Sequence, residues 1–140
     1  MYEIAQKIRE VFLENRAEID LPFFHRFPVN SCESASYFLG ALLAKFLSDK
    51  EVFVVHGYKH SSDESHFWVE VDGKVIDITV DQFTEFSEPI YGAEVHPLSA
   101  KFKPDSKVEA IKGINQFDLV SQEKKKEVLN QILHLLQVRT

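Results

Sequence analysis

The sequence predicts an α+β fold in which N-terminal helices pack on a small antiparallel β-sheet. Two stretches within residues 1–47 carry apolar side chains at the spacing of a helix with one buried face. After them, two β-branched and aromatic segments flank Asp72-Gly73, a dipeptide typical of a tight hairpin turn. A length of 140 residues favours a single domain over residues 1–140.

The first predicted element is an amphipathic helix that ends near Arg16. Its buried face is formed by Ile4, Ile8, Val11 and Phe12. Pro22 and Pro28 disfavour helix between residues 19 and 31, so this stretch is predicted to be extended or looped.

A second helix is predicted to begin at Cys32 and to continue to about Leu47. Asn30 or Ser31 can cap its first turn. Cys32 is the only cysteine of the chain, and its position at a helix start exposes it to the positive end of the helix dipole. That field favours the thiolate over the thiol.

Three strands are predicted after the helices, over residues 52–58, 66–71 and 74–80. Residues 90–91 or 93–96 are candidates for pairing at a sheet edge. Val108, Ile111 and Ile114 indicate a short helical segment, and Ser121 is placed to cap a last helix.

Composition narrows the partners that the chain is expected to have. A net charge of -6 argues against general binding of nucleic acid or of an anionic membrane surface. A single cysteine forms no internal disulfide, and no apolar stretch is long enough to span a bilayer. No secretory signal is recognisable at the N-terminus, so we expect a cytoplasmic protein.

The hairpin turn predicts which side chains meet across the sheet. With Asp72 and Gly73 as the central turn residues, Trp68 faces Asp77 across the ladder. Because side chains alternate along a strand, His66 and Asp77 then share one face as diagonal neighbours, about 7–8 Å apart at Cα. A carboxylate at that separation can reach an imidazole ring.

A cysteine, a histidine and an acid are together sufficient for acyl transfer through a thiol. Cys32 is the predicted nucleophile, His66 the base and then the acid, and Asp77 the group that orients the imidazole. The developing oxyanion needs hydrogen-bond donors, for which the Cys32 N–H, Asn30 and Gln82 are candidates. Trp68 is a candidate substrate-binding side chain, although packing within the sheet is the commoner role of such a residue.

The segments 31–36, 66–70 and 75–79 resemble the papain-like and transglutaminase-like cysteine enzymes, and the run on to Asp81-Gln82-Phe83 resembles small stand-alone bacterial members of this superfamily. In those enzymes the cysteine opens a helix, and the histidine and acid lie on successive antiparallel strands. The chain lacks a Cys-Gly-Ser-Cys-Trp run, a tryptophan after Cys32 and paired glycines before it. The resemblance therefore concerns the superfamily rather than one subfamily.

The resemblance implies a peptidase or amidase that acts on a peptide or protein substrate without a cofactor. A transglutaminase or other amine acyltransferase shares the first half-reaction and differs in the acyl acceptor. A binding or regulatory module that keeps the fold without turnover is the alternative from a different class.

Two further alternatives concern individual side chains. Asp81 competes with Asp77 for the third catalytic role, although strand alternation places it less directly opposite His66. His56, His60 and His96 could join Cys32 and His66 as metal ligands. Their spacing matches no compact zinc motif, so no metal site is predicted.

Overall fold

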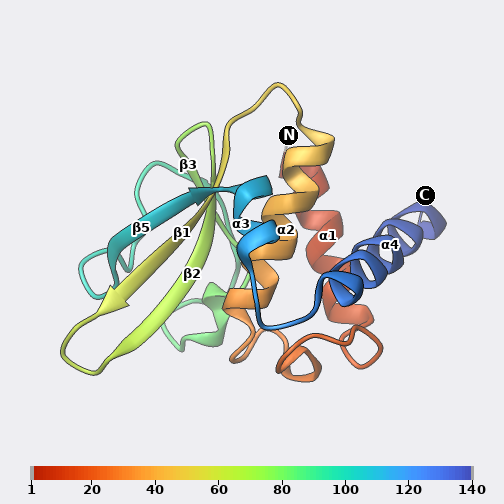
Figure 1. The fold of residues 1–140 in the computed structure, drawn as a ribbon. Helices are drawn as coiled ribbons and strands as arrows, with labels where there is room; N and C mark the ends of the chain where they lie inside the picture. Colours follow the sequence, from red (N-terminus) through yellow and green to blue (C-terminus); the bar gives the residue numbers. More distant parts are fainter. Residues whose placement is uncertain (1, 140) are drawn as a thin grey trace.

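The computed structural model describes residues 2–139, and within them it contains four α-helices and a five-stranded antiparallel sheet (Figure 1). The helices are α1 (Tyr2–Glu14), α2 (Cys32–Phe46), α3 (Ala110–Gln116) and α4 (Gln122–Arg139). Two 3₁₀ turns, η1 (Phe24–Arg26) and η2 (Val80–Gln82), lie in the connections. The predicted α+β class is confirmed.

The strands are β1 (Val52–Lys59), β2 (Glu64–Val71), β3 (Lys74–Asp77), β4 (Ile90–Ala93) and β5 (Lys103–Glu109), and their order in the sheet is β4-β3-β2-β1-β5. The β2–β3 hairpin has the predicted register, with Val71 opposite Lys74. Asp72 and Gly73 both have positive φ, as a tight turn of this kind requires.

Helix α2 packs directly on the sheet against β2 and β1, and α1 and α4 pack against each other farther out (Figure 1). The main core lies between these helices and the face of β2 that carries Val69 and Val71. A second apolar cluster covers the opposite face, where Trp68 packs with Leu98 and Phe102. Both faces of the central strand β2 are therefore buried, which holds its side chains in fixed positions.

The predicted third strand extends too far: β3 ends at Asp77 and not at residue 80. Asp77 Oδ1 accepts hydrogen bonds from the N–H of Thr79 at 3.0 Å and from its hydroxyl at 3.3 Å. A side chain that bonds the backbone two residues ahead favours a turn over continued ladder pairing. The chain consequently leaves the sheet, and the 3₁₀ turn η2 follows.

β5 is not predicted from the sequence, which instead indicates a helix at Val108. In the structure Val108 lies in β5, opposite Val54 of β1. β5 is an edge strand with mostly exposed, charged side chains and a proline, a composition that protects an edge but carries no alternating apolar signal. The helix begins only at Ala110, where the Glu109 carboxylate accepts hydrogen bonds from Ile111 N–H and Lys112 N–H.

The predicted cap of α4 is present, whereas the predicted side-chain cap of α2 is not. Ser121 Oγ accepts a hydrogen bond from Lys124 N–H at 3.1 Å, as predicted for the start of α4. Ser31 occupies the N-cap position of α2, but its side chain makes no capping bond and its Oγ is buried without a partner. No helix within residues 2–139 combines the length and the apolar character that crossing a bilayer demands.

Candidate active site

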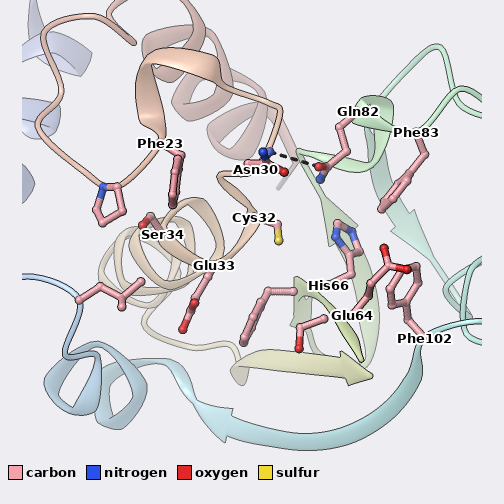
Figure 2. A pocket seen from close by; sticks show the side chains of 14 residues that line it. Phe23, Asn30, Cys32, Glu33, Ser34, Glu64, His66, Gln82, Phe83 and Phe102 are labelled. Atoms are coloured by element: carbon pink, nitrogen blue, oxygen red, sulfur yellow. Dashed lines mark hydrogen bonds between the residues drawn. The ribbon is translucent and has the colours of Figure 1, made fainter. Parts of the chain in front are cut away.

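The start of α2 brings Cys32 to the wall of a cavity of about 430 Å³. Asn30, two residues earlier, has a φ of 57°, a left-handed conformation that asparagine tolerates better than most residues. Cys32 is partly exposed, so its sulfur is accessible from the cavity. In Figure 2 the sulfur points across the cavity toward the His66 ring.

His66 and Asp77 form a buried hydrogen-bonded pair. His66 Nε2 lies 2.7 Å from Asp77 Oδ2, and each side chain is only 1% exposed. The second carboxylate oxygen is held by Thr79, so the carboxylate is fixed at both ends. The contact that the hairpin register predicted from sequence is thus present in the structure.

The electrostatic surroundings shift the pKa values of His66 and Asp77 in opposite directions, which favours the charged form of each. Burial lowers the pKa of His66, but the Asp77 carboxylate and the neighbouring Cys32 outweigh burial and raise this pKa to about 10. Burial raises the pKa of Asp77, but His66 and His96 outweigh it and hold this pKa well below its usual value of 3.8.

The other ring nitrogen of His66 is the atom that matters for chemistry. Nδ1 is buried and has no hydrogen-bond partner within residues 2–139, while Cys32 is close enough to raise the pKa of the ring. Both Cys32 and His66 line the cavity. The imidazole is therefore anchored through Nε2 and presents Nδ1 on the side of the thiol, where a proton can pass between them.

His96 is part of this arrangement, although the sequence suggested it only as a possible metal ligand and not as a partner of Asp77. Its Nε2 lies 2.7 Å from Asp77 Oδ2, the same oxygen that His66 contacts. Its Nδ1 accepts a hydrogen bond from Leu98 N–H at 3.0 Å. A ring nitrogen that accepts carries no proton, so His96 is the neutral tautomer with its proton on Nε2, where it donates to the carboxylate.

Gln82 offers a donor next to the thiol. Its Oε1 accepts a hydrogen bond from the backbone N–H of Asn30 at 3.3 Å, whereas its Nε2 is buried without a partner (Figure 2). Gln82 and Asn30 both line the cavity with Cys32. An unpaired amide N–H₂ at such a position is suited to an oxygen that arrives with a ligand.

The remaining sequence candidates have other surroundings. Trp68 is 1% exposed and is absent from the cavity wall; its ring packs on His96 with centroids 4.3 Å apart. Asp81 forms an ion pair with Arg9 of α1, which separates it from the histidines. The structure thus places Asp77 rather than Asp81 beside His66, and it places Trp68 in the second apolar cluster, outside the lining of this cavity.

Within residues 2–139, side chains of the kinds that bind metal ions form one cluster. Ligand atoms of His66, Asp77 and His96 all lie within 4.8 Å of one another. His56 and His60 do not belong to this cluster. His56 forms a hydrogen bond with Ser65 Oγ, and the His60 ring packs edge-on against Tyr58. Both contacts to Asp77 measure 2.7 Å, and the tautomer of His96 places a proton in one of them. The set is therefore arranged as a hydrogen-bonded network.

Scans against protein-family models, curated proteins and solved structures found no match to this chain. The resemblance to papain-like and transglutaminase-like enzymes consequently remains a prediction that depends on the Cys32, His66 and Asp77 segments. The side-chain geometry described above is the basis for any assignment of function.

Proposed function

We propose that this chain is a cysteine-dependent acyl-transfer enzyme that acts as a peptidase or amidase. One observation carries the proposal: His66 is anchored to Asp77 through Nε2 at 2.7 Å, and its unpartnered Nδ1 lies in a cavity wall with Cys32. A nucleophile, a base and a group that orients the base are the parts that covalent acyl transfer requires.

In the first step, the Cys32 thiolate attacks the carbonyl carbon of a substrate amide while His66 carries the thiol proton as an imidazolium. A C–S bond forms, and the carbonyl electron pair moves to oxygen. When the tetrahedral intermediate collapses, the C–N bond breaks and His66 gives its proton to the departing amine. Water, deprotonated by His66, then attacks the thioester carbonyl, and the C–S bond breaks, which releases the acid and restores the Cys32 thiolate beside the His66 imidazolium.

The oxygen of the tetrahedral intermediate needs donors that are already in place. The backbone N–H of Cys32 at the first turn of α2 and Nε2 of Gln82 are proposed for this role. Asn30 contributes by its backbone N–H, which holds the Oε1 of Gln82 and thereby orients Nε2. An amine that replaces water in the second step gives transamidation by the same residues.

The test begins from the fact that Cys32 is the only thiol, so a labelled electrophile reports this residue alone. Native protein is to be incubated with a peptide library, and both hydrolysis and amine incorporation are measured by mass spectrometry. Cys32→Ser should abolish turnover, because a serine hydroxyl is not ionised by this site. Asp77→Asn should reduce it, by up to about 10⁴ if the acid acts as in a serine triad.

Asp49→Asn is the matched control for Asp77→Asn, because Asp49 is exposed just beyond the far end of α2. It should retain full turnover. Turnover that survives in Cys32→Ser would exclude the thiol mechanism. A native protein that binds library peptides, hydrolyses none and binds equally well as Cys32→Ser would instead be a non-catalytic module.

A further inference from the structure

Apart from His66, the titratable side chains with a formal charge that line the cavity are all acidic. Two carboxylates, Glu33 and Glu64, line the cavity, and its wall contains no lysine or arginine. Glu33 follows Cys32 directly in the first turn of α2, whereas Glu64 begins β2. A substrate that enters this cavity therefore meets negative charge beside the reactive sulfur.

The two carboxylates differ in whether they already have partners. Glu64 is exposed, accepts a hydrogen bond from the Ser62 hydroxyl and lies 3.9 Å from the Lys59 ammonium group. Glu33 makes no hydrogen bond or ion pair within residues 2–139, and its charged neighbour is another acid, Asp118. Burial and that like charge raise the pKa of Glu33.

Burial and the like charge of Asp118 disfavour the ionised form of Glu33. A carboxylate in the first turn of a helix is normally stabilised by the helix dipole. At Glu33, partial burial and the repulsion from Asp118 outweigh that effect. A cationic group beside Glu33 would offset both the repulsion from Asp118 and the partial burial of an unpaired carboxylate.

The cavity also carries a separate indication that it receives a ligand. Gln82 lines this cavity, and its Nε2 is buried without a hydrogen-bond partner within residues 2–139. Phe23 and Leu119, which are 57% and 49% exposed, add apolar surface to the same wall. Long basic side chains have an aliphatic stem and a charged end, and such a wall accommodates both parts.

We propose that the cavity selects a lysine or arginine side chain of a peptide substrate, with its cationic end at Glu33, whose negative charge Asp118 reinforces, and its stem along Phe23 and Leu119. This inference rests on the proposed function for the reaction, but its recognition step is independent of turnover. The substrate class is a basic peptide whose scissile or acyl-donating carbonyl lies next to the basic residue.

The experiment uses two chloromethyl ketones that differ only in the terminal ammonium group of the side chain, N-acetyl-lysyl and N-acetyl-norleucyl. Each alkylates Cys32, forming a C–S bond with loss of chloride. For every variant, the selectivity ratio is the second-order rate constant of the lysyl reagent divided by that of the norleucyl reagent. Changes in thiol reactivity affect both rate constants and cancel in this ratio. We expect a ratio of about 10 in the native protein, equivalent to about 1.4 kcal/mol.

Glu33→Gln should bring the ratio most of the way to 1, and the Glu33→Gln/Asp118→Asn double variant should bring it to about 1. Asp49→Asn removes the same charge beyond the other end of α2 and should keep the native ratio. Equal rates for the two reagents in the native protein, or a preference for lysine that persists in the double variant, would overturn the proposal.

The two proposals fail in distinguishable ways. Labelling that prefers the lysyl reagent, combined with no turnover of any peptide, contradicts the proposed function and supports the selection of basic side chains. Peptide turnover with no difference between lysine and norleucine at the residue next to the cleaved bond contradicts the selection alone.

Discussion

Nε2 of His96 donates a hydrogen bond to Oδ2 of Asp77 at 2.7 Å, so this carboxylate oxygen is shared by two imidazole rings. The two rings are held differently. The Asp77 carboxylate and Cys32 outweigh burial and raise the pKa of His66 to about 10, whereas Nδ1 of His96 accepts a hydrogen bond from Leu98 N–H. His96 thus acts as a positioning residue that holds Asp77 without competing for its charge.

The first prediction concerns His96. His96→Gln keeps an N–H donor for Asp77, whereas His96→Ala removes it and leaves a buried carboxylate oxygen with one donor fewer. The alanine variant should lose about 1–3 kcal/mol of unfolding free energy, and the glutamine variant less. Urea unfolding measures both.

A second measurement separates positioning from mere stability. Nitrogen-15 NMR of the native protein should show the His96 proton on Nε2 and none on Nδ1. The pH profile of Cys32 alkylation should shift in His96→Ala and be largely restored in His96→Gln. A native His96 protonated on Nδ1 would contradict the assignment.

The second prediction concerns the thiol and His66. An imidazolium that stays charged through neutral pH stabilises a neighbouring thiolate. Alkylation of native Cys32 by iodoacetamide should therefore remain substantial at pH 6. A free thiol with a pKa of about 8.5 is only about 1% ionised near pH 6.5. His66→Ala should slow the reaction at pH 6 by at least about tenfold, and equal rates at that pH would remove His66 from the site.

The third prediction concerns stability against pH. The pKa of His66 is raised from 6.5 to about 10, so its contribution is complete below pH 6.5 and is lost as the pH rises through 10. The pKa of Asp77 is lowered from 3.8, so its contribution is present above pH 3.8 and is lost as the pH falls through the lowered value.

The free energy of unfolding that Asp77→Asn removes should consequently be greatest between about pH 4 and pH 6.5, at about 3–5 kcal/mol, and should shrink toward pH 10. Urea unfolding of both proteins over this range measures it. Asp49→Asn, with its exposed carboxylate, should give a small difference throughout. A loss in Asp77→Asn that is constant from pH 5 to pH 10 would show that the pair is not ionised.

The fourth prediction concerns Gln82. Gln82→Ala removes the unpartnered Nε2 donor, so turnover should fall by about 10²–10³ if this amide stabilises the oxyanion. Gln82→Glu retains the size and the acceptor for Asn30 N–H, but it places an acceptor where the donor was, and it should not restore turnover. Alkylation of Cys32 by iodoacetamide forms no oxyanion and serves as the control reaction, which should change much less than turnover.

The sequence alone was enough to predict α2 and the β2–β3 hairpin, because both depend on local signals. Apolar periodicity follows Cys32 for four turns, and the Asp72-Gly73 turn sets the register that places Asp77 beside His66. These two elements contain Cys32, His66 and Asp77, so the proposed catalytic residues could be identified without coordinates.

Tertiary structure decided the features that depend on residues distant in sequence. His96 lies 19 residues after Asp77 in an irregular segment, and no local pattern indicates that its ring meets the carboxylate. The edge strand β5 is recognisable only from its pairing with β1, since its own side chains are mostly exposed. Which carboxylate has a partner was also decided in space: Arg9 pairs with Asp81, while Glu33 is left next to Asp118. Periodicity and turn chemistry act over a few residues, whereas hydrogen bonds and charges act between whichever groups packing brings together.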